Sequence, residues 1–247
     1  MNTFPDPPNI NQFVDAEARQ FARTFELCQE EIKFLEKIHE FYIAVMRGQN
    51  VNPSEATLLH LLALIHYNFL FSSTTYARGH LAEACNSARV AIDAALIAAY
   101  IIHDRTSQEA YIDRKSPFDK LIRHYKNMIK DQKPLPHSFI PTLIKQHDFF
   151  SRYASHADVD SFAYRSEFME NDGMASTRVS YFQIPQNNDY FKHHFLGLLK
   201  SFILTLDVFS TYFVDERKVV PASWRENLRA VGRQIENKQA QLIPVAV

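Results

Sequence analysis

Two short segments place charged or titratable side chains at helical spacing inside apolar surroundings. Arg89 and Asp93 are four residues apart in an alanine-rich run, and Arg152 and His156 are four apart in a later polar segment. Residues at this spacing share one helix face. A neutral imidazole can take a proton from a hydroxyl, and a guanidinium can stabilise a phosphorane-like transition state. These groups are the minimum equipment for metal-independent RNA cleavage, in which the ribose 2′-hydroxyl attacks its own phosphate.

The same residues also fit a purely structural role. A charge among alanine, valine and isoleucine costs free energy unless it finds a partner, so the two segments are candidate partners of each other across neighbouring helices. An ion pair between Arg89 and Asp93 along one helix margin is a further alternative. A nuclease needs Arg152 and His156 open to solvent, whereas a link between helices needs them buried with every donor satisfied. The sequence leaves both readings open.

Ser-Ala-Arg-x-x-x-Asp in a long helix, followed by Ser-Arg-Tyr-Ala-Ser-His at the end of a later one, resembles the HEPN superfamily over about residues 77–160. In HEPN ribonucleases an arginine is followed, after four to six residues, by a histidine, with a polar or acidic support on a neighbouring helix. The resemblance implies that His156 is the general acid/base and Arg152 binds the scissile phosphate. It implies Asp93 as the orienting support, and Arg89 or Ser155 as further contacts. Here only three residues separate Arg152 from His156, fewer than in the family motif.

The resemblance also implies a biological setting and partners. HEPN ribonucleases are associated with toxin or phage-defence systems and commonly form their sites across a dimer, so RNA and a second copy of the chain are the implied partners. Many HEPN-like proteins are non-catalytic binding modules. The alternative function is therefore a helical interaction or scaffold module that uses the same residues to hold its helices together.

Other chemistries have less support. Glu36 and His39 match the Glu-x-x-His spacing of di-iron bundles, but that motif is needed twice and occurs here once, so we expect no metal site. There is no Gly-x-Ser-x-Gly elbow and no glycine-rich phosphate loop, and we expect no cofactor. Cys28 and Cys85 lack paired metal-ligand spacing and are predicted to be buried, reduced thiols.

Composition and periodicity predict an all-α, up-and-down helical bundle, HEPN-like in its centre, with a small inserted β-hairpin. The 247 residues are 46% hydrophobic, enough for a sizeable core, and only five are glycine, which suits long helices. We expect one bundle over 1–215, with the hairpin at about 161–184, and a surface helix with a tail over 216–247. Helices are predicted at 11–47 (one long or two in tandem), 53–71, 76–104, 118–131, 137–153, 190–214 and 221–241.

Charge and hydropathy bear on partners and location. With 27 basic and 28 acidic residues, the chain has no global field that favours nucleic acid. A basic stripe on the last predicted helix fits a solvated face, an RNA guide or a dock for a protein partner; it consists of Lys218, Arg225, Arg229, Arg233 and Lys238. The polar start at 1–8 is unlike a secretory signal, and the three longest apolar runs are short or carry histidine, aspartate or lysine. These features predict a cytoplasmic protein that makes no membrane contact.

Overall fold

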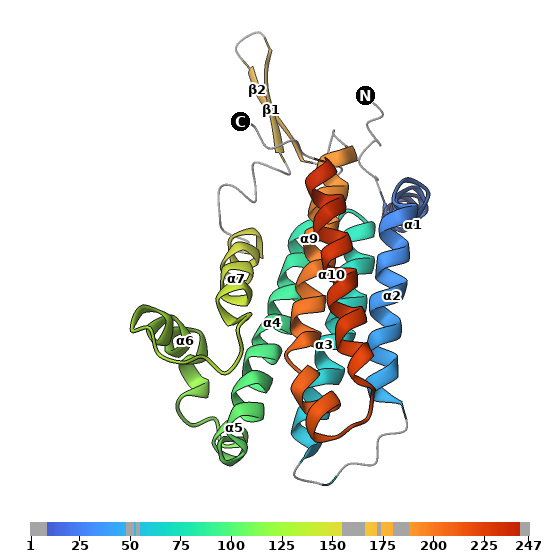
Figure 1. The fold of residues 1–247 in the computed structure, drawn as a ribbon. Coiled ribbons are helices and arrows are strands. Elements are labelled where there is room, and N and C mark those ends of the chain that lie inside the picture. Colours follow the sequence, from blue (N-terminus) through green and yellow to red (C-terminus); the bar gives the residue numbers. More distant parts are fainter. Residues whose placement is uncertain are drawn as a thin grey trace.

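The structure is a computed structural model that describes residues 9–47, 52, 55–154, 166–171, 174–179 and 188–242. Over these residues the chain is a helical bundle accompanied by one pair of short strands (Figure 1), so the predicted all-α class is confirmed. The long helices of the bundle are α2 (Gln29–Met46), α3 (Ala56–Ala77), α4 (Leu81–His103), α9 (Asn188–Asp207) and α10 (Ala222–Leu242).

The core lies where α2, α3 and α9 meet, and it is filled by aromatic side chains. Tyr42 of α2 is fully buried, and its ring stacks on Phe69 of α3 with centroids 5.5 Å apart. Its hydroxyl donates a hydrogen bond of 3.0 Å to the carbonyl of Phe202 in α9, so this buried polar atom is satisfied. Burial raises the pKa of the Tyr42 phenol, which stays neutral. Three helices are thus joined through one side chain.

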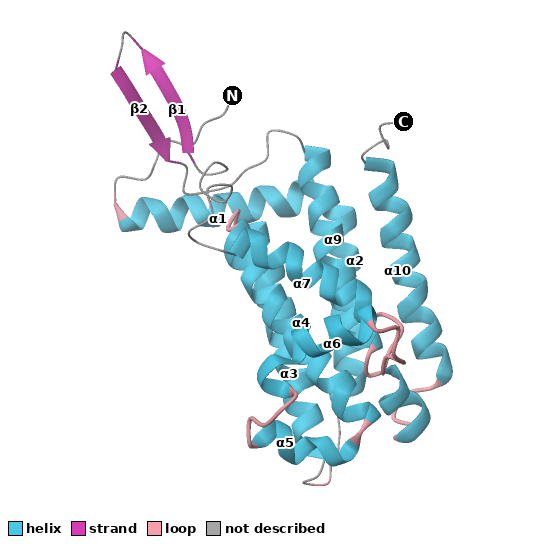
Figure 2. Cartoon of the chain, turned by 90° about the vertical axis from the view of Figure 1, so that its left-hand side faces the viewer, coloured by secondary structure: helices cyan, strands magenta, loops and turns pink. Residues whose placement is uncertain are grey.

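The predicted 11–47 segment is two helices. The first, α1 (Ile10–Leu27), starts at Asn9, whose side chain accepts a hydrogen bond from the backbone N–H of Gln12 at 3.0 Å. The helices are separated at Cys28, which has a non-helical backbone and is completely buried. Figure 2 shows the result: α1 runs across one end of the bundle and projects beyond it on the side of α3 and α4.

A sharp corner joins α3 to α4. Gly79 has a φ of 85°, a left-handed conformation that costs glycine little and other residues more. The chain then reverses, and Ser72 of α3 donates a 2.7 Å hydrogen bond to the carbonyl of Ala84 in α4. The small side chains Ala84, Ala88, Ala91 and Ala95 are buried, as their helix spacing predicts, and they let the two helices pack closely.

Short elements follow α4 and lead to a flanking pair of helices. They are a 3₁₀ turn (Arg105–Ser107), α5 (Gln108–Ile112), a second 3₁₀ turn (Phe118–Lys120), α6 (Leu121–Lys130) and α7 (Ile140–Ala154). Tyr125 of α6 is buried and donates a 3.1 Å hydrogen bond to the carbonyl of Leu96 in α4. In Figure 1, α7 packs alongside α4 and runs in the opposite direction, which is the arrangement that positions the candidate site.

Two strands, β1 (Ser166–Asn171) and β2 (Met174–Val179), pair antiparallel, with Ser166 opposite Val179 and Asn171 opposite Met174. They extend away from the helices (Figure 1).

After α9 the chain forms a π-helical turn (Thr211–Glu216) and then α10, which packs against α9 and α2. Trp224 of α10 is buried, with an edge-to-face contact to Phe41 of α2 at 5.8 Å between centroids.

The prediction of a cytoplasmic protein without membrane contact is wrong, because it is contradicted by the length and composition of three helical segments. Three helical segments are long and apolar enough to cross a membrane: Ala56–Ala77, Leu81–His103 and Asn188–Glu216, with mean hydropathies of 1.3, 1.4 and 1.4. The prediction gave too much weight to single polar residues. The whole of α3 contains no Asp, Glu, Lys or Arg, and in α9 Asp207 faces a partner helix, where it is 1% exposed.

Candidate functional site

The interface of α4 and α7 holds the polar residues that the sequence singled out. Asp93 projects from α4 toward α7, where its Oδ1 lies 3.3 Å from Nε2 of His147. The Asp93 side chain is 42% exposed and that of His147 is 15% exposed, so the pair sits at the edge of the interface. The carboxylate predicted to orient Arg152 or His156 therefore lies against a different histidine, which precedes Arg152 by five residues in the chain.

The contact continues through α7 to α6. Nδ1 of His147 lies 3.5 Å from Oδ1 of Asp148, and the ammonium of Lys126 in α6 donates a 2.9 Å hydrogen bond to the same carboxylate oxygen. Partial burial raises the pKa of Asp148, but the hydrogen bonds from Lys126 and His147 outweigh this, and the pKa is lowered overall. Asp93, His147, Asp148 and Lys126 form a chain across three helices, which we call the α4–α7–α6 link. Both ring nitrogens of His147 face carboxylates, which leaves neither free to serve a substrate.

The predicted arginines occupy different environments. Arg89 lies one turn before Asp93 on α4; its side chain is half-buried, and its Nε is buried without a hydrogen-bond partner among the described residues. Within that part of the chain no ion pair joins Arg89 to Asp93. Arg152 is exposed, near the end of α7. Ser155 and His156 lie outside the described residues, so the pairing of Arg152 with His156 stays a prediction.

Sequence reasoning missed His147, Asp148 and Lys126. The first two precede Arg152 by about one turn on the same helix, and an adjacent His-Asp pair there was a usable signal. Nothing in the sequence pointed to Lys126, because the register of α6 against α7 is set by packing.

No family model, curated protein or solved structure matches this chain.

A second polar cluster lies between α9, α10 and the segment before α7. Asp207 is 1% exposed, and its Oδ2 accepts a 2.9 Å hydrogen bond from Nε of Arg229. The Arg229 guanidinium also lies over the ring of Phe139, 5.8 Å from its centroid. Burial lowers the pKa of the nearby His137, and the negative charge of Asp207 opposes that shift only in part.

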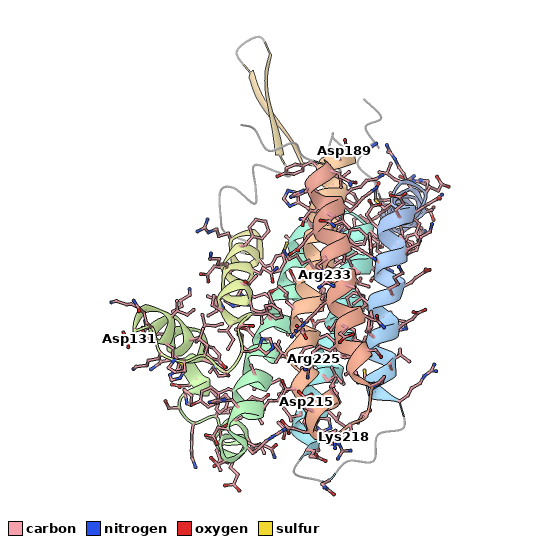
Figure 3. The ribbon with its side chains drawn as sticks, viewed as in Figure 1. Asp131, Asp189, Asp215, Lys218, Arg225 and Arg233 are labelled. Carbon is pink, nitrogen blue, oxygen red and sulfur yellow. The ribbon has the colours of Figure 1, made fainter. Side chains whose placement is uncertain are left out.

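Other members of the predicted basic stripe are also engaged with neighbours. Arg225 donates hydrogen bonds to the Ser210 carbonyl at 3.1 Å and to the Asp215 carboxylate at 2.5 Å, near the lower end of α10 (Figure 3). Lys238 pairs with Glu30 of α2. Arg233 is exposed on the outer side of α10. Three of the five basic side chains thus pair with acids of other elements: Arg225, Arg229 and Lys238.

His39, which was considered as a metal ligand, pairs with His66. Nδ1 of His39 in α2 lies 3.0 Å from Nε2 of His66 in α3, so one ring donates a hydrogen bond to the other. The rings stack with centroids 5.1 Å apart. Glu36 does not join them in any cluster: within the described residues no group of three or more histidine, cysteine, aspartate or glutamate side chains is arranged to hold a metal ion.

Proposed function

We propose that this chain is a HEPN-like helical protein and that the end of the α4–α7 interface that carries Arg152 holds the active site of a metal-independent endoribonuclease. The observation that carries the proposal is the exposure of Arg152 near the end of α7, the helix that contacts α4 through the pair of His147 and Asp93. An exposed guanidinium can reach a phosphate, which a buried one cannot. The toxin or phage-defence setting implied by the family resemblance belongs to this proposal as well.

Each residue of the proposed site has a separate role in RNA cleavage. Arg152 binds the scissile phosphate and stabilises the charge that develops on it, and His156 moves the proton of the 2′-hydroxyl. The α4–α7–α6 link holds α7 against α4 and so fixes the helix that presents Arg152. Asp93 and His147 are positioning residues in this scheme, because His147 has both ring nitrogens directed at carboxylates.

A ribonuclease assay on total cellular RNA, with a chelator and no added metal, tests the proposal. The unaltered chain should cleave RNA and leave 2′,3′-cyclic phosphate ends. His156→Ala and Arg152→Ala should each lower the rate by about 10²-fold or more, as expected for loss of a general acid/base or of charge stabilisation. The matched control is Arg23→Ala, which alters an exposed arginine on α1 outside the basic stripe and should cleave normally. Circular dichroism checks that each variant is folded. Absence of cleavage by the unaltered chain would refute the proposal.

The second candidate is a non-catalytic interaction module. It is favoured by the α4–α7–α6 link, which uses Asp93 to join helices. A chain that leaves RNA intact but loses stability when the link is cut would support this candidate.

A further inference from the structure

An apolar surface on α3 is left uncovered by the rest of the chain. The exposed α3 face consists of Ala63, Leu64, Tyr67, Leu70 and Phe71, which recur every three or four residues and so line one side of the helix. The exposed fractions of the four large side chains are 42%, 62%, 37% and 44%. Tyr67 and Phe71 stack with centroids 6.0 Å apart, so the face is an ordered surface. Single exposed apolar side chains are common, but a continuous stripe marks an interaction site.

The stripe continues from α3 onto α1. Arg78 follows the last turn of α3, and its guanidinium lies over the ring of Phe21 in α1, 5.5 Å from the centroid. Phe21 contacts Phe25 at 4.6 Å between centroids, and Phe25 is 36% exposed. Toward the start of α1, Val14 and Ile10 are 54% and 72% exposed. Figure 2 shows α1 projecting beyond the bundle on the side of α3.

The projection of α1 is held in place by specific contacts. The hydroxyl of Thr24 donates a 2.7 Å hydrogen bond to the carbonyl of Ala77, at the end of α3. The Glu17 carboxylate lies 3.2 Å from Nε2 of His80 and 3.8 Å from Nε of Arg78. These contacts fix α1 to the corner between α3 and α4, so its exposed apolar side chains belong to a defined surface.

We infer that the exposed α3 face and the apolar side of α1 dock onto a lipid bilayer, with acyl chains as the occupant. The α3 helix has no Asp, Glu, Lys or Arg along its 22 residues, so it offers a protein partner no charge to pair with, whereas hydrocarbon requires none. Arg78, at the border of the face with a side chain 40% exposed, is suited to a lipid headgroup. This inference is independent of the proposed nuclease activity.

The bundle docks on the surface of the bilayer and does not cross it. In the segment Asn188–Glu216, 83% of the most apolar 18-residue stretch is buried inside the bundle. These buried side chains cannot contact lipid. On α10, Arg225, Arg229 and Arg233 would enter the hydrocarbon if the whole bundle crossed, at a cost of several kcal/mol for each charge. Among the described residues, α3 and α1 together present the run of exposed apolar side chains that is compatible with acyl chains.

Vesicle flotation of the full chain tests this inference, with vesicles of phosphatidylcholine alone and of phosphatidylcholine mixed with phosphatidylglycerol. The unaltered chain should float with both kinds of vesicle, because the contact is with acyl chains. The double substitution Leu64→Glu/Tyr67→Glu should lower the bound fraction by about ten-fold or more, since it places two charges in the apolar contact. The matched control is Ile112→Glu, which alters a residue 61% exposed on α5 and should float normally.

Sedimentation of the same proteins without vesicles identifies the competing occupant, a second copy of the chain. If the unaltered chain does not float but forms a dimer that Leu64→Glu/Tyr67→Glu dissociates, the face is a contact between copies and the inference is overturned. It is also overturned if the double variant floats as well as the unaltered chain. Circular dichroism spectra establish that both glutamate variants remain folded, as expected for exposed positions.

Discussion

At the scale of single residues, Asp93 shows how far sequence reasoning reaches. A carboxylate among alanines needs a partner, and the structure supplies His147 of α7, a residue that precedes the predicted partner segment 151–158. The adjacent histidine and aspartate at 147 and 148 were a usable signal on α7, but the contact of His147 with Asp93 could not be predicted, because spacing along the chain relates only residues of one helix. The register of α4 against α7 depends on side-chain packing along the whole interface.

The α4–α7–α6 link leads to a prediction about stability. Asp93→Ala and His147→Ala should each lower the free energy of unfolding by about 1 kcal/mol, because Asp93 is partly solvated and the pair is screened. The double variant should lose less than the sum of the two, since each substitution removes the same contact. Urea unfolding followed by circular dichroism measures all three. Asp119→Ala, which removes an exposed pair with Lys120, serves as the control and should change little. Fully additive losses would show that Asp93 and His147 are not coupled.

At the scale of elements, the sequence predicted the presence of the helices better than their ends. The prediction ended one helix at 71 and started the next at 76, because Ser72 to Thr75 favour turns. In the structure α3 continues to Ala77. The hydroxyls of this stretch are accommodated in the helix: Ser72 donates to a carbonyl of α4, and Thr74 donates at 2.8 Å to the carbonyl of Leu70 one turn earlier. The true break falls at Gly79, the residue with positive φ.

The attachment of α10 to α9 depends on one buried carboxylate. Arg229→Ala would leave Asp207 buried without its charged partner, and we expect a loss of about 3 kcal/mol in the free energy of unfolding, at the lower end for a broken buried pair because Arg229 is 45% exposed. Arg229→Ala/Asp207→Ala should recover part of that loss by removing the stranded charge. Chemical denaturation measures both, with Arg233→Ala as the exposed-arginine control. Equal stability of Arg229→Ala and Arg233→Ala would contradict this role for Asp207.

At the scale of the whole molecule, apolar content and helical periodicity were enough to predict the all-α class, but not which apolar side chains would remain at the surface. Exposure is a tertiary property: apolar side chains occur on several faces of α3, and the placement of its neighbours leaves Leu64, Tyr67 and Phe71 uncovered. The location was mispredicted because single polar residues were given too much weight in three helical segments that are long and apolar enough to cross a membrane. A search of the sequence for uninterrupted membrane spans does not show which side of a helical bundle is apolar and exposed.

Surface docking through α3 and α1 fixes the orientation of the molecule, and the single tryptophan makes that orientation measurable. Trp224 is 6% exposed in α10, packed against Phe41 of α2, so brominated acyl chains should leave its fluorescence unchanged when the chain binds vesicles. Tyr67→Trp adds a second indole at a position 62% exposed on the α3 face, and the added emission should be quenched by the same lipids. Quenching of Trp224 in the unaltered chain would place α10 in the hydrocarbon and favour a crossing bundle. Both tryptophans belong to the same bound molecule, so their emission can be compared directly. If the bundle lies on the bilayer with α10 facing water, the brominated lipids should quench only the indole that Tyr67→Trp adds.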